Sequence, residues 1–262
     1  MDPARGAALA ATLGLVFDPA APLPPFFHQA YFWQALPPAA LGGDGHPRPG
    51  GPGVPVPDLG LPRRMWAGGR LEFARPLKAG RPASRATVCE TVRRTEGRTG
   101  PLAFVTLRHE IAQDGAVAVV EWQDLVYRAA HTPDAPQPEA PTAPPDADPE
   151  PLDFDATLLF RYSALTFNGH RIHYDADYAR RVEGYPGPVV HGPLLAQLLM
   201  LRATRDLGAL RRFDFRATAP LILGEGAVLC RAGTDLWVRG PGGRMCMRAT
   251  AETVGGEPGR DI

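Results

Sequence analysis

The sequence GPLLAQLLMLRATRDL at residues 192–207 sets the architecture expected for this chain. Its apolar side chains are too dense for a helix with one wet face, so it predicts a helix enclosed on most sides. Short apolar runs typical of strands follow it at residues 213–221, 227–231, 235–239 and 244–253. A curved antiparallel sheet wrapped around one buried helix is the simplest arrangement that covers these surfaces. This part of the chain is therefore expected to be α+β.

The segments upstream predict further elements of the same kinds. An apolar run at residues 158–165 is interpreted as a strand, and residues 176–182 as a short helix. The first half begins with a predicted helix at residues 7–13 and the aromatic sequence PPFFHQAYFW at residues 24–33, which we expect in the core. Residues 42–62 show no periodicity and predict an ordered loop or flap. An antiparallel meander should follow, with turns at Glu96-Gly97 and Asp114-Gly115 and strands at residues 66–73, 86–93, 102–111 and 117–127.

A proline-rich segment separates the two halves. Residues 132–151 contain eight prolines, five acidic residues and no aromatic residue. Such a composition buries very little surface, so it predicts an extended, solvated linker. We therefore expect an N-terminal unit at residues 1–131, a linker at residues 132–152 and a C-terminal unit at residues 153–262.

Charge and cysteine content exclude several classes of protein. The 262 residues carry 28 Lys and Arg against 28 Asp and Glu, so no overall field would attract nucleic acid or an anionic membrane surface. No uninterrupted apolar run is long enough to span a bilayer, so no membrane partner is expected. The odd cysteine count, with Cys89, Cys230 and Cys246 in predicted strands, favours buried thiols in a reducing compartment, by default the cytoplasm.

The densest polar cluster is TFNGHRIHYD at residues 166–175, and His191-Gly192 stands directly before the enclosed helix. His170 and His173 could belong to a polar turn whose rings bond the backbone. They could also bind a metal together with His191, but this HxxH does not lie on a regular helix and is not a recognised ligand spacing. Gly192 is suggestive in another way, because a glycine at a helix N-terminus lets a substrate oxygen approach a free backbone N–H.

Residues 168–175, followed by PVVHGPLL at residues 188–195, resemble the hot-dog-fold hydratases and dehydratases of the MaoC-like and (R)-specific hydratase family. FNGHRIHYD and PRRMWAGGR, residues 62–70, resemble in particular the subgroup that contains 3-methylfumaryl-CoA (mesaconyl-CoA) hydratase and the type 2 hydroxyacyl-thioester dehydratases. The resemblance covers about residues 22–130 and 155–253. It implies a double hot-dog, in which each half is a curved antiparallel sheet wrapped around a central helix.

The family pattern Asp-x-Asn-Pro-x-His-x-Asp places its histidine on His173, and the glycine of its later His-Gly pair on Gly192. The sequence departs from the pattern at its catalytic Asp, which falls on Asn168, and at its Asn, which falls on His170. An asparagine cannot accept a proton at neutral pH, so Asn168 could only orient the water or the histidine. The resemblance therefore implies that His173 is the base, with His170 sharing that task, and that Gly192 polarises the thioester carbonyl.

Three arginines and a tryptophan of the first half are further candidates. Arg63, Arg64 and Arg70 suit the phosphates of coenzyme A or a free carboxylate of the acyl chain. An exposed basic turn or structural ion pairs would explain them equally well. Trp66 is either a packing aromatic or, with His191, part of the substrate-binding surface.

The expected activity is the addition or removal of water at the double bond of an α,β-unsaturated acyl-CoA, with 3-methylfumaryl-CoA as a candidate substrate. The thioester carbonyl is itself the electron sink, so no metal or redox cofactor is expected. The partner is an acyl-CoA or an acyl-carrier-protein thioester, and a homodimer is an open alternative to a monomer. The rival interpretations are a thioesterase and a non-catalytic acyl-thioester binding protein on the same fold.

Overall fold

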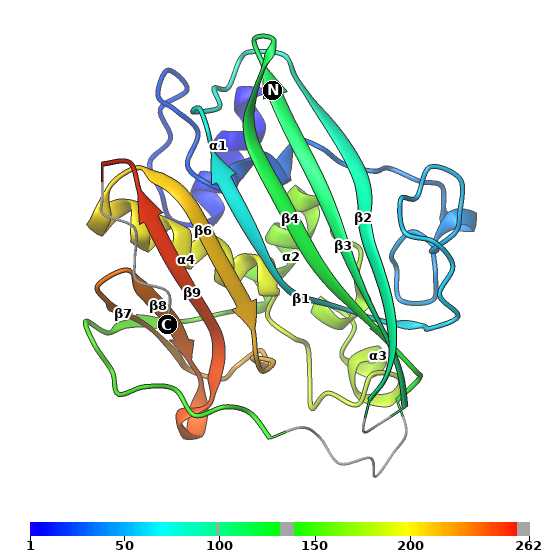
Figure 1. The fold of residues 1–262 in the computed structure, drawn as a ribbon. Helices are drawn as coiled ribbons and strands as arrows, with labels where there is room; N and C mark the ends of the chain where they lie inside the picture. The colour runs from blue at the N-terminus through cyan, green and yellow to red at the C-terminus, as the bar shows by residue number, and fades with distance from the viewer. Residues whose placement is uncertain (98–99, 132–138, 256–262) are drawn as a thin grey trace.

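The computed structural model describes residues 1–97, 100–131 and 139–255. Within these ranges nine antiparallel strands form one sheet in the order β2-β3-β4-β1-β6-β9-β8-β7-β5 (Figure 1). No helix in these ranges is long and apolar enough to cross a membrane. The strands are β1 (Arg63–Phe73), β2 (Ala83–Gly97), β3 (Gly100–Gln113), β4 (Ala116–Arg128), β5 (Glu150–Leu152), β6 (Leu210–Ala217), β7 (Ala227–Ala232), β8 (Asp235–Arg239) and β9 (Met245–Thr253).

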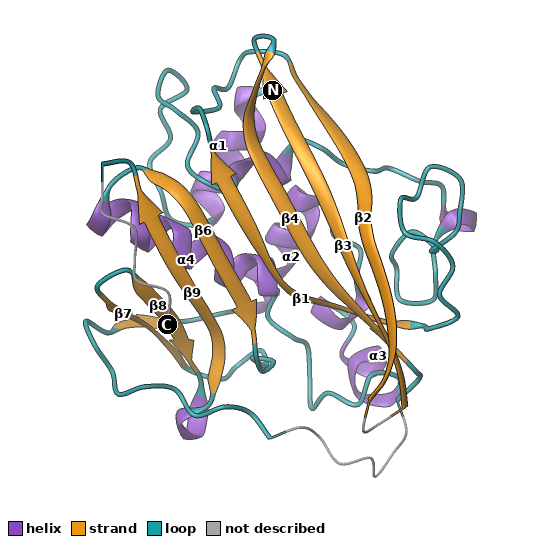
Figure 2. Cartoon of the chain, in the orientation of Figure 1, coloured by secondary structure: helices purple, strands orange, loops and turns teal. Residues whose placement is uncertain are grey.

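Three helices lie together against one face of this sheet: α1 (Pro3–Thr12), α2 (Ala156–Thr166) and α4 (Gly192–Leu207) (Figure 2). A fourth, α3 (Ala176–Arg181), lies beside the end of the long strands of the first half (Figure 1). This arrangement confirms the expected α+β class.

The two halves meet where β1 pairs with β6, so the sheet runs from one half into the other. Two glycines in β1 make this junction close. A Cβ added at Gly68 would lie 2.6 Å from the carbonyl oxygen of Phe215, and one added at Gly69 would lie 2.5 Å from that of Trp122. The Ala-Gly-Gly segment after Trp66 thus joins the halves by letting three strands approach without side chains between them.

Helix α4 has the bounds that the sequence predicts. It begins after His191, carries Pro193 in its first turn and ends at Gly208, whose φ of 101° suits glycine. Leu194 and Leu199 are fully buried. The enclosed helix is therefore confirmed, and it is the centre of the main apolar core.

The first half fills the same face of the sheet differently. Its helix is the shorter α1, ten residues long, which packs against α2 and the 3-10 turn η1 (Phe27–Ala30). Phe26 and Phe27 are fully buried in the core that α4 also occupies. The aromatic segment is thus a core element, as expected, and the two halves share one apolar interior.

Residues 158–165 were expected to be a strand, and this prediction is wrong because they lie in helix α2. Asp155 caps the helix by accepting a hydrogen bond from the backbone N–H of Leu158 at 2.7 Å. Leu159, Tyr162 and Ser163 are buried at helical spacing on one side. A short apolar run cannot distinguish helix from strand, whereas the capping aspartate could have done so.

The proline-rich segment lies outside the described residues at 132–138, and its described part is attached to the second half. Glu150 lies in β5, which adds an edge strand to β7. Arg202 of α4 forms ion pairs with Asp148 and Glu150. Residues 139–152 are mostly exposed, as expected, but these contacts fix them to α4 because the acidic residues face its basic end. The unit boundaries themselves stay a prediction.

Turn chemistry explains the long hairpins of the first half. Asp114 and Gly115 have φ values of 53° and 76°, as a two-residue hairpin turn requires, and they connect β3 to β4 directly. The strands β2, β3 and β4 extend beyond the ranges that the sequence predicts. The other predicted turn, at Glu96-Gly97, adjoins residues 98–99, which lie outside the described residues.

Candidate active site

The loop between α2 and α3 holds the polar residues that the sequence singles out. Asn168 Oδ1 accepts a hydrogen bond from the backbone N–H of His170 at 3.1 Å. A 3-10 turn, η3 (Arg171–His173), follows, and His170 and His173 are 5% and 7% exposed. Asp175 then caps α3 with its carboxylate. The loop thus directs both histidines inward while its two ends are fixed by side-chain caps.

Three buried imidazoles and the partly buried ring of His46 form a continuous row at this loop. The ring centroids of His46 and His170 are 4.7 Å apart, those of His170 and His173 are 5.5 Å apart, and those of His173 and His191 are 3.7 Å apart. The last two rings are stacked, with 21° between their planes. His170, His173 and His191 therefore lie together, and His46 joins them from the loop of the first half.

His173 has a defined tautomer. Its Nδ1 lies 2.7 Å from the carbonyl oxygen of Val189, which can only accept, so Nδ1 carries the proton. The other nitrogen, Nε2, consequently has a free lone pair and no hydrogen-bond partner among the described residues. Burial lowers the pKa of His173 to about 4, although the bond to Val189 opposes this shift. The ring is thus neutral at neutral pH and presents an accepting nitrogen.

His191 is fully buried and supports His173 by stacking on it. Its Nε2 lies 2.7 Å from Ser163 Oγ, while its Nδ1 is buried without a partner among the described residues. The ring of Tyr162 packs edge-on against it at 5.1 Å, and the Tyr162 hydroxyl is likewise buried and unpartnered. Burial holds the pKa of His191 well below its ordinary value. Unsatisfied polar atoms are rare in a folded interior, and several gather here.

Gly192 begins α4 directly after His191. No described residue accepts a hydrogen bond from its backbone N–H. A Cβ at this position would have only the carbonyl oxygen of Trp66 nearby, at 3.8 Å, among the described atoms. An open donor at the positive end of a sixteen-residue helix is suited to an oxyanion.

The loop of the first half docks onto the histidine loop through two glycines. Gly45 has a φ of 88°, and a Cβ there would overlap the carbonyl group of Gly169. The backbone N–H of Arg171 donates to the carbonyl oxygen of Asp44 at 2.9 Å. These contacts bring His46 against His170. The sequence indicated an ordered loop or flap here but did not indicate that it contributes to the site.

The candidates of the first half, Arg63, Arg64, Trp66 and Arg70, differ in their partners. Arg63 is bound to the carboxylate of Glu183 at 2.7 Å and to its carbonyl oxygen at 2.8 Å. Arg70 stacks on Trp122 at 3.7 Å. Trp66 donates to Gly68 and packs in the core between both apolar clusters. The structure thus gives Arg63 and Arg70 other partners within the chain, and it leaves Arg64 to the cavity described next.

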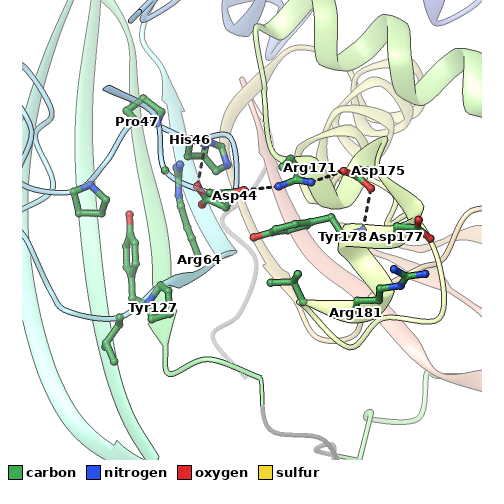
Figure 3. A pocket seen from close by; sticks show the side chains of 16 residues that line it. Asp44, His46, Pro47, Arg64, Tyr127, Arg171, Asp175, Asp177, Tyr178 and Arg181 are labelled. Atoms are coloured by element: carbon green, nitrogen blue, oxygen red, sulfur yellow. Dashed lines mark hydrogen bonds and ion pairs between the residues drawn. The ribbon is translucent and has the colours of Figure 1, made fainter. Parts of the chain in front are cut away.

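A cavity of about 760 Å³ adjoins the row at His46 (Figure 3). The first half supplies one wall, with Asp44, His46 and Arg64, and the second half supplies the opposite wall around Tyr178 (Figure 3). Its lining includes neither His173 nor Gly192. The residues around it are Gly42, Gly43, Asp44, His46, Pro47, Pro49, Leu61, Pro62, Arg64, Tyr127, Arg171, Asp175, Asp177, Tyr178, Arg181 and Val182.

The metal interpretation has no support in the geometry of the described residues, in which no three His, Cys, Asp or Glu side chains are grouped to hold an ion. Two signals of the site were not recognised in the sequence. His46 is surrounded by glycines in GGDGHPRPGG, which mark a close backbone approach. Ser163 could have been recognised only if residues 158–165 had been assigned to a helix, because the helix turns its side chain toward His191.

Comparison with known proteins places this geometry in context. A family model described as hydroxyacyl-thioester dehydratase type 2 matches residues 26–223. The chain is 45% identical over 241 residues to mesaconyl-C(4)-CoA hydratase of Chloroflexus aurantiacus, covering 89% of this chain and 85% of that protein. It is 27% identical over 257 residues to the mitochondrial hydroxyacyl-thioester dehydratase type 2 of Schizosaccharomyces pombe, covering 82% and 80%.

Solved structures share the fold at low sequence identity. HtdX of Mycobacterium tuberculosis superposes with a TM-score of 0.68 at 19% identity, covering 97% of this chain and 96% of that one. A MaoC-like dehydratase from Phytophthora capsici gives a TM-score of 0.64 at 13% identity, covering 97% and 94%. The expected α+β double hot-dog is therefore confirmed, with both halves in one chain.

Proposed function

The chain belongs to the type 2 hydroxyacyl-thioester dehydratase family and is a hydro-lyase of acyl-CoA thioesters, and from this premise we propose that its substrate is mesaconyl-C4-CoA and that His173 is its base. The relative at 45% identity is named for that substrate. The observation that carries the residue assignment is the bond from His173 Nδ1 to Val189, because it leaves Nε2 free to accept a proton.

Hydration begins when Nε2 of His173 takes a proton from water as the oxygen attacks the β-carbon. The electron pair of the double bond moves toward the thioester oxygen, where the N–H of Gly192 and the dipole of α4 stabilise the developing charge. The imidazolium returns its proton to the α-carbon, so that water is added overall. The pKa of about 4 makes this return favourable, and dehydration is the same path reversed.

The other predicted site residues have supporting roles in this proposal. Asn168 uses one lone pair of its amide oxygen on the backbone of His170, and its second lone pair and its NH₂ group can orient water. His191 holds the ring of His173 by stacking, and the backbone carbonyl oxygen of Trp66 lies 3.8 Å from the position of a Cβ at Gly192. His170 has an unpartnered Nε2 with which it can share the proton transfer. Arg64 keeps its predicted role in substrate binding.

We further propose a cytoplasmic enzyme that uses coenzyme A, the carrier in the name of the relative at 45% identity. All three cysteines, Cys89, Cys230 and Cys246, are free, which suits a reducing compartment. The chain already contains both halves of a paired fold, and a homodimer stays a prediction.

The test is to follow the absorbance of the conjugated thioester with purified protein and crotonyl-CoA, a long-chain enoyl-CoA and mesaconyl-C4-CoA. We expect hydration of mesaconyl-C4-CoA with the highest kcat/KM of the panel. A thiol reagent in parallel detects free coenzyme A, which a thioesterase would release. A higher kcat/KM with the long-chain thioester would reject the proposed substrate, and thiol release without hydration would reject the proposed reaction.

A further inference from the structure

Arg64 is a partly buried guanidinium whose charge acts on the carboxylate of Asp44 without forming an ion pair with it. It makes no hydrogen bond or ion pair with any described residue, although it lines a cavity between the two halves. The preceding residue, Arg63, differs because its guanidinium donates two hydrogen bonds to Glu183. A partly buried cation without a hydrogen bond or ion pair loses hydration that the fold does not replace, and a ligand anion can replace it.

The formal charges around the cavity balance, with three arginines and three aspartates, but most of these groups already have partners or face solvent. Arg171 and Asp175 pair with each other at 2.7 Å. Asp44 accepts from the backbone N–H of His46 at 3.0 Å, and it forms no ion pair with Arg64. Arg181 and Asp177 are exposed to solvent on the opposite wall (Figure 3). Arg64 is thus the inward guanidinium available to a ligand among the described lining residues.

His46 lies next to Arg64 on the same wall (Figure 3). Its ring packs on His170 at 4.7 Å, and His170 has a buried Nε2 without a described partner. Burial lowers the pKa of both histidines well below the ordinary value, and the charge of Arg64 lowers both further. The two rings are therefore neutral hydrogen-bonding groups within the field of one guanidinium.

We propose that Arg64 and His46 form a subsite for an anionic group of the thioester substrate, supplied by the first half to a site whose base lies in the second. The proposal rests on the function proposed above. Arg64 donates to the oxyanion through its guanidinium, and His46 donates through a ring N–H. The anion is either the free carboxylate of a dicarboxylic acyl chain or a phosphate of coenzyme A.

The two sources imply opposite directions of binding. If the acyl carboxylate lies at Arg64, the acyl end reaches the cavity from the side of His170, close to the base. If a phosphate lies there, the cavity holds the carrier and the acyl chain points past His46 into the core. The cavity, at about 760 Å³, has the size of a site for a ligand much larger than a five-carbon acyl group, so both directions are tested.

The experiment compares Arg64→Met with wild type on three substrates: mesaconyl-C4-CoA, crotonyl-CoA and crotonyl-pantetheine, which has no phosphate. We expect kcat/KM to fall about 50-fold on the substrate that carries the bound anion, mostly through KM, the usual size for a lost charged hydrogen bond. A loss confined to mesaconyl-C4-CoA identifies the acyl carboxylate. An equal loss on both CoA thioesters and none on crotonyl-pantetheine identifies a phosphate.

Equal effects on all three substrates, or no effect, would overturn the subsite. Arg108→Met is the matched control, because Arg108 pairs with Glu110 and is no part of the cavity lining. His46→Gln and His46→Phe separate hydrogen bonding from packing: we expect Gln to keep most of the affinity and Phe to lose about 10-fold.

A binding measurement keeps this proposal distinct from the proposed reaction. Calorimetric titration with methylsuccinyl-CoA, butyryl-CoA and coenzyme A requires no turnover. If wild type binds them with an affinity that depends on Arg64 but hydrates no enoyl thioester, the reaction fails and the subsite stands. If it hydrates mesaconyl-C4-CoA and Arg64→Met binds all three as wild type does, the subsite fails and the reaction stands.

Discussion

Each half of the molecule buries histidines, and the two groups are built in opposite ways. In the first half His28 donates to Glu121 at 2.8 Å, and Gln29 and Gln123 donate to the same carboxylate at 2.8 Å. Burial is the largest single effect and raises the pKa of Glu121, but the bonds from His28 and Gln123 and the nearby His28 and His109 rings together outweigh it and lower that pKa to about 2. This carboxylate has its hydrogen bonds satisfied.

The row formed by His46, His170, His173 and His191 is not satisfied in this way. No described carboxylate bonds to any of its rings. His170 Nε2 and His191 Nδ1 are buried without described partners. The comparison teaches that burial and histidine content alone do not mark a functional site. The group around Glu121 stabilises the fold, although His109, paired with Glu121 across β3 and β4, also has a buried Nε2 without a described partner. The row differs because no described carboxylate bonds to its rings, which leaves their nitrogens available to a substrate.

The largest effect is expected at His173. Replacing it by Ala should lower kcat for hydration about 10³-fold, since the proton acceptor is lost, while the melting temperature changes little. Steady-state kinetics and thermal unfolding of the same preparations measure both quantities. Activity within a few-fold of wild type would show that the base lies elsewhere.

Glu121→Gln should show the reverse pattern. The variant places an amide group against His28, Gln29 and Gln123, which donate to a carboxylate in the wild type. The free energy of unfolding should therefore fall by about 3 kcal/mol. kcat per folded molecule should stay near wild type, as measured after urea titration fixes the folded fraction. A loss of activity with unchanged stability would make the first-half group catalytic and would remove the contrast.

The two groups should also lose stability in different pH ranges. The folded pKa of His173 is about 4 against 6.5 for a free histidine, so the unfolded chain binds the proton first as pH falls. Stability is therefore full above pH 6.5 and declines toward pH 4, by about 3 kcal/mol from this residue. Glu121 has a pKa of about 2 against 4.5, so its contribution is lost only between pH 4.5 and 2.

Urea unfolding at pH 7.5 and pH 5 of wild type and His173→Gln checks the first range. The variant lacks one titrating ring, so its stability should fall less between these pH values. Equal losses in both proteins would mean that His173 is not a buried neutral histidine.

The smallest effect is expected at Ser163, which holds His191 through one hydrogen bond at 2.7 Å. Ser163→Ala should reduce kcat by about 5-fold and stability by about 1 kcal/mol, because His191 loses its orientation under His173. Ser163→Thr retains the hydroxyl and serves as the control. A variant with Ala that is as inactive as His173→Ala would assign Ser163 a direct chemical role.

Local patterns in the sequence predicted α4 with its bounds and the hairpin at Asp114-Gly115, while the family resemblance implied that His170 and His173 act at one site with Gly192. They failed for α2, because a short apolar run fits both periods until Asp155 is recognised as a cap. They also failed for His46, whose position depends on the contact of Gly45 with Gly169, more than a hundred residues apart. Local periodicity contains no information on such a contact.

A crystal structure with methylsuccinyl-CoA, the saturated analogue that cannot be hydrated, examines the assignment of the site most directly. The account predicts the thioester oxygen within hydrogen-bond distance of the Gly192 nitrogen, and the β-carbon on the side of His173 that carries Nε2. A thioester bound in the first half beside His28 and Glu121, with His173 Nε2 remote from it, would contradict the account.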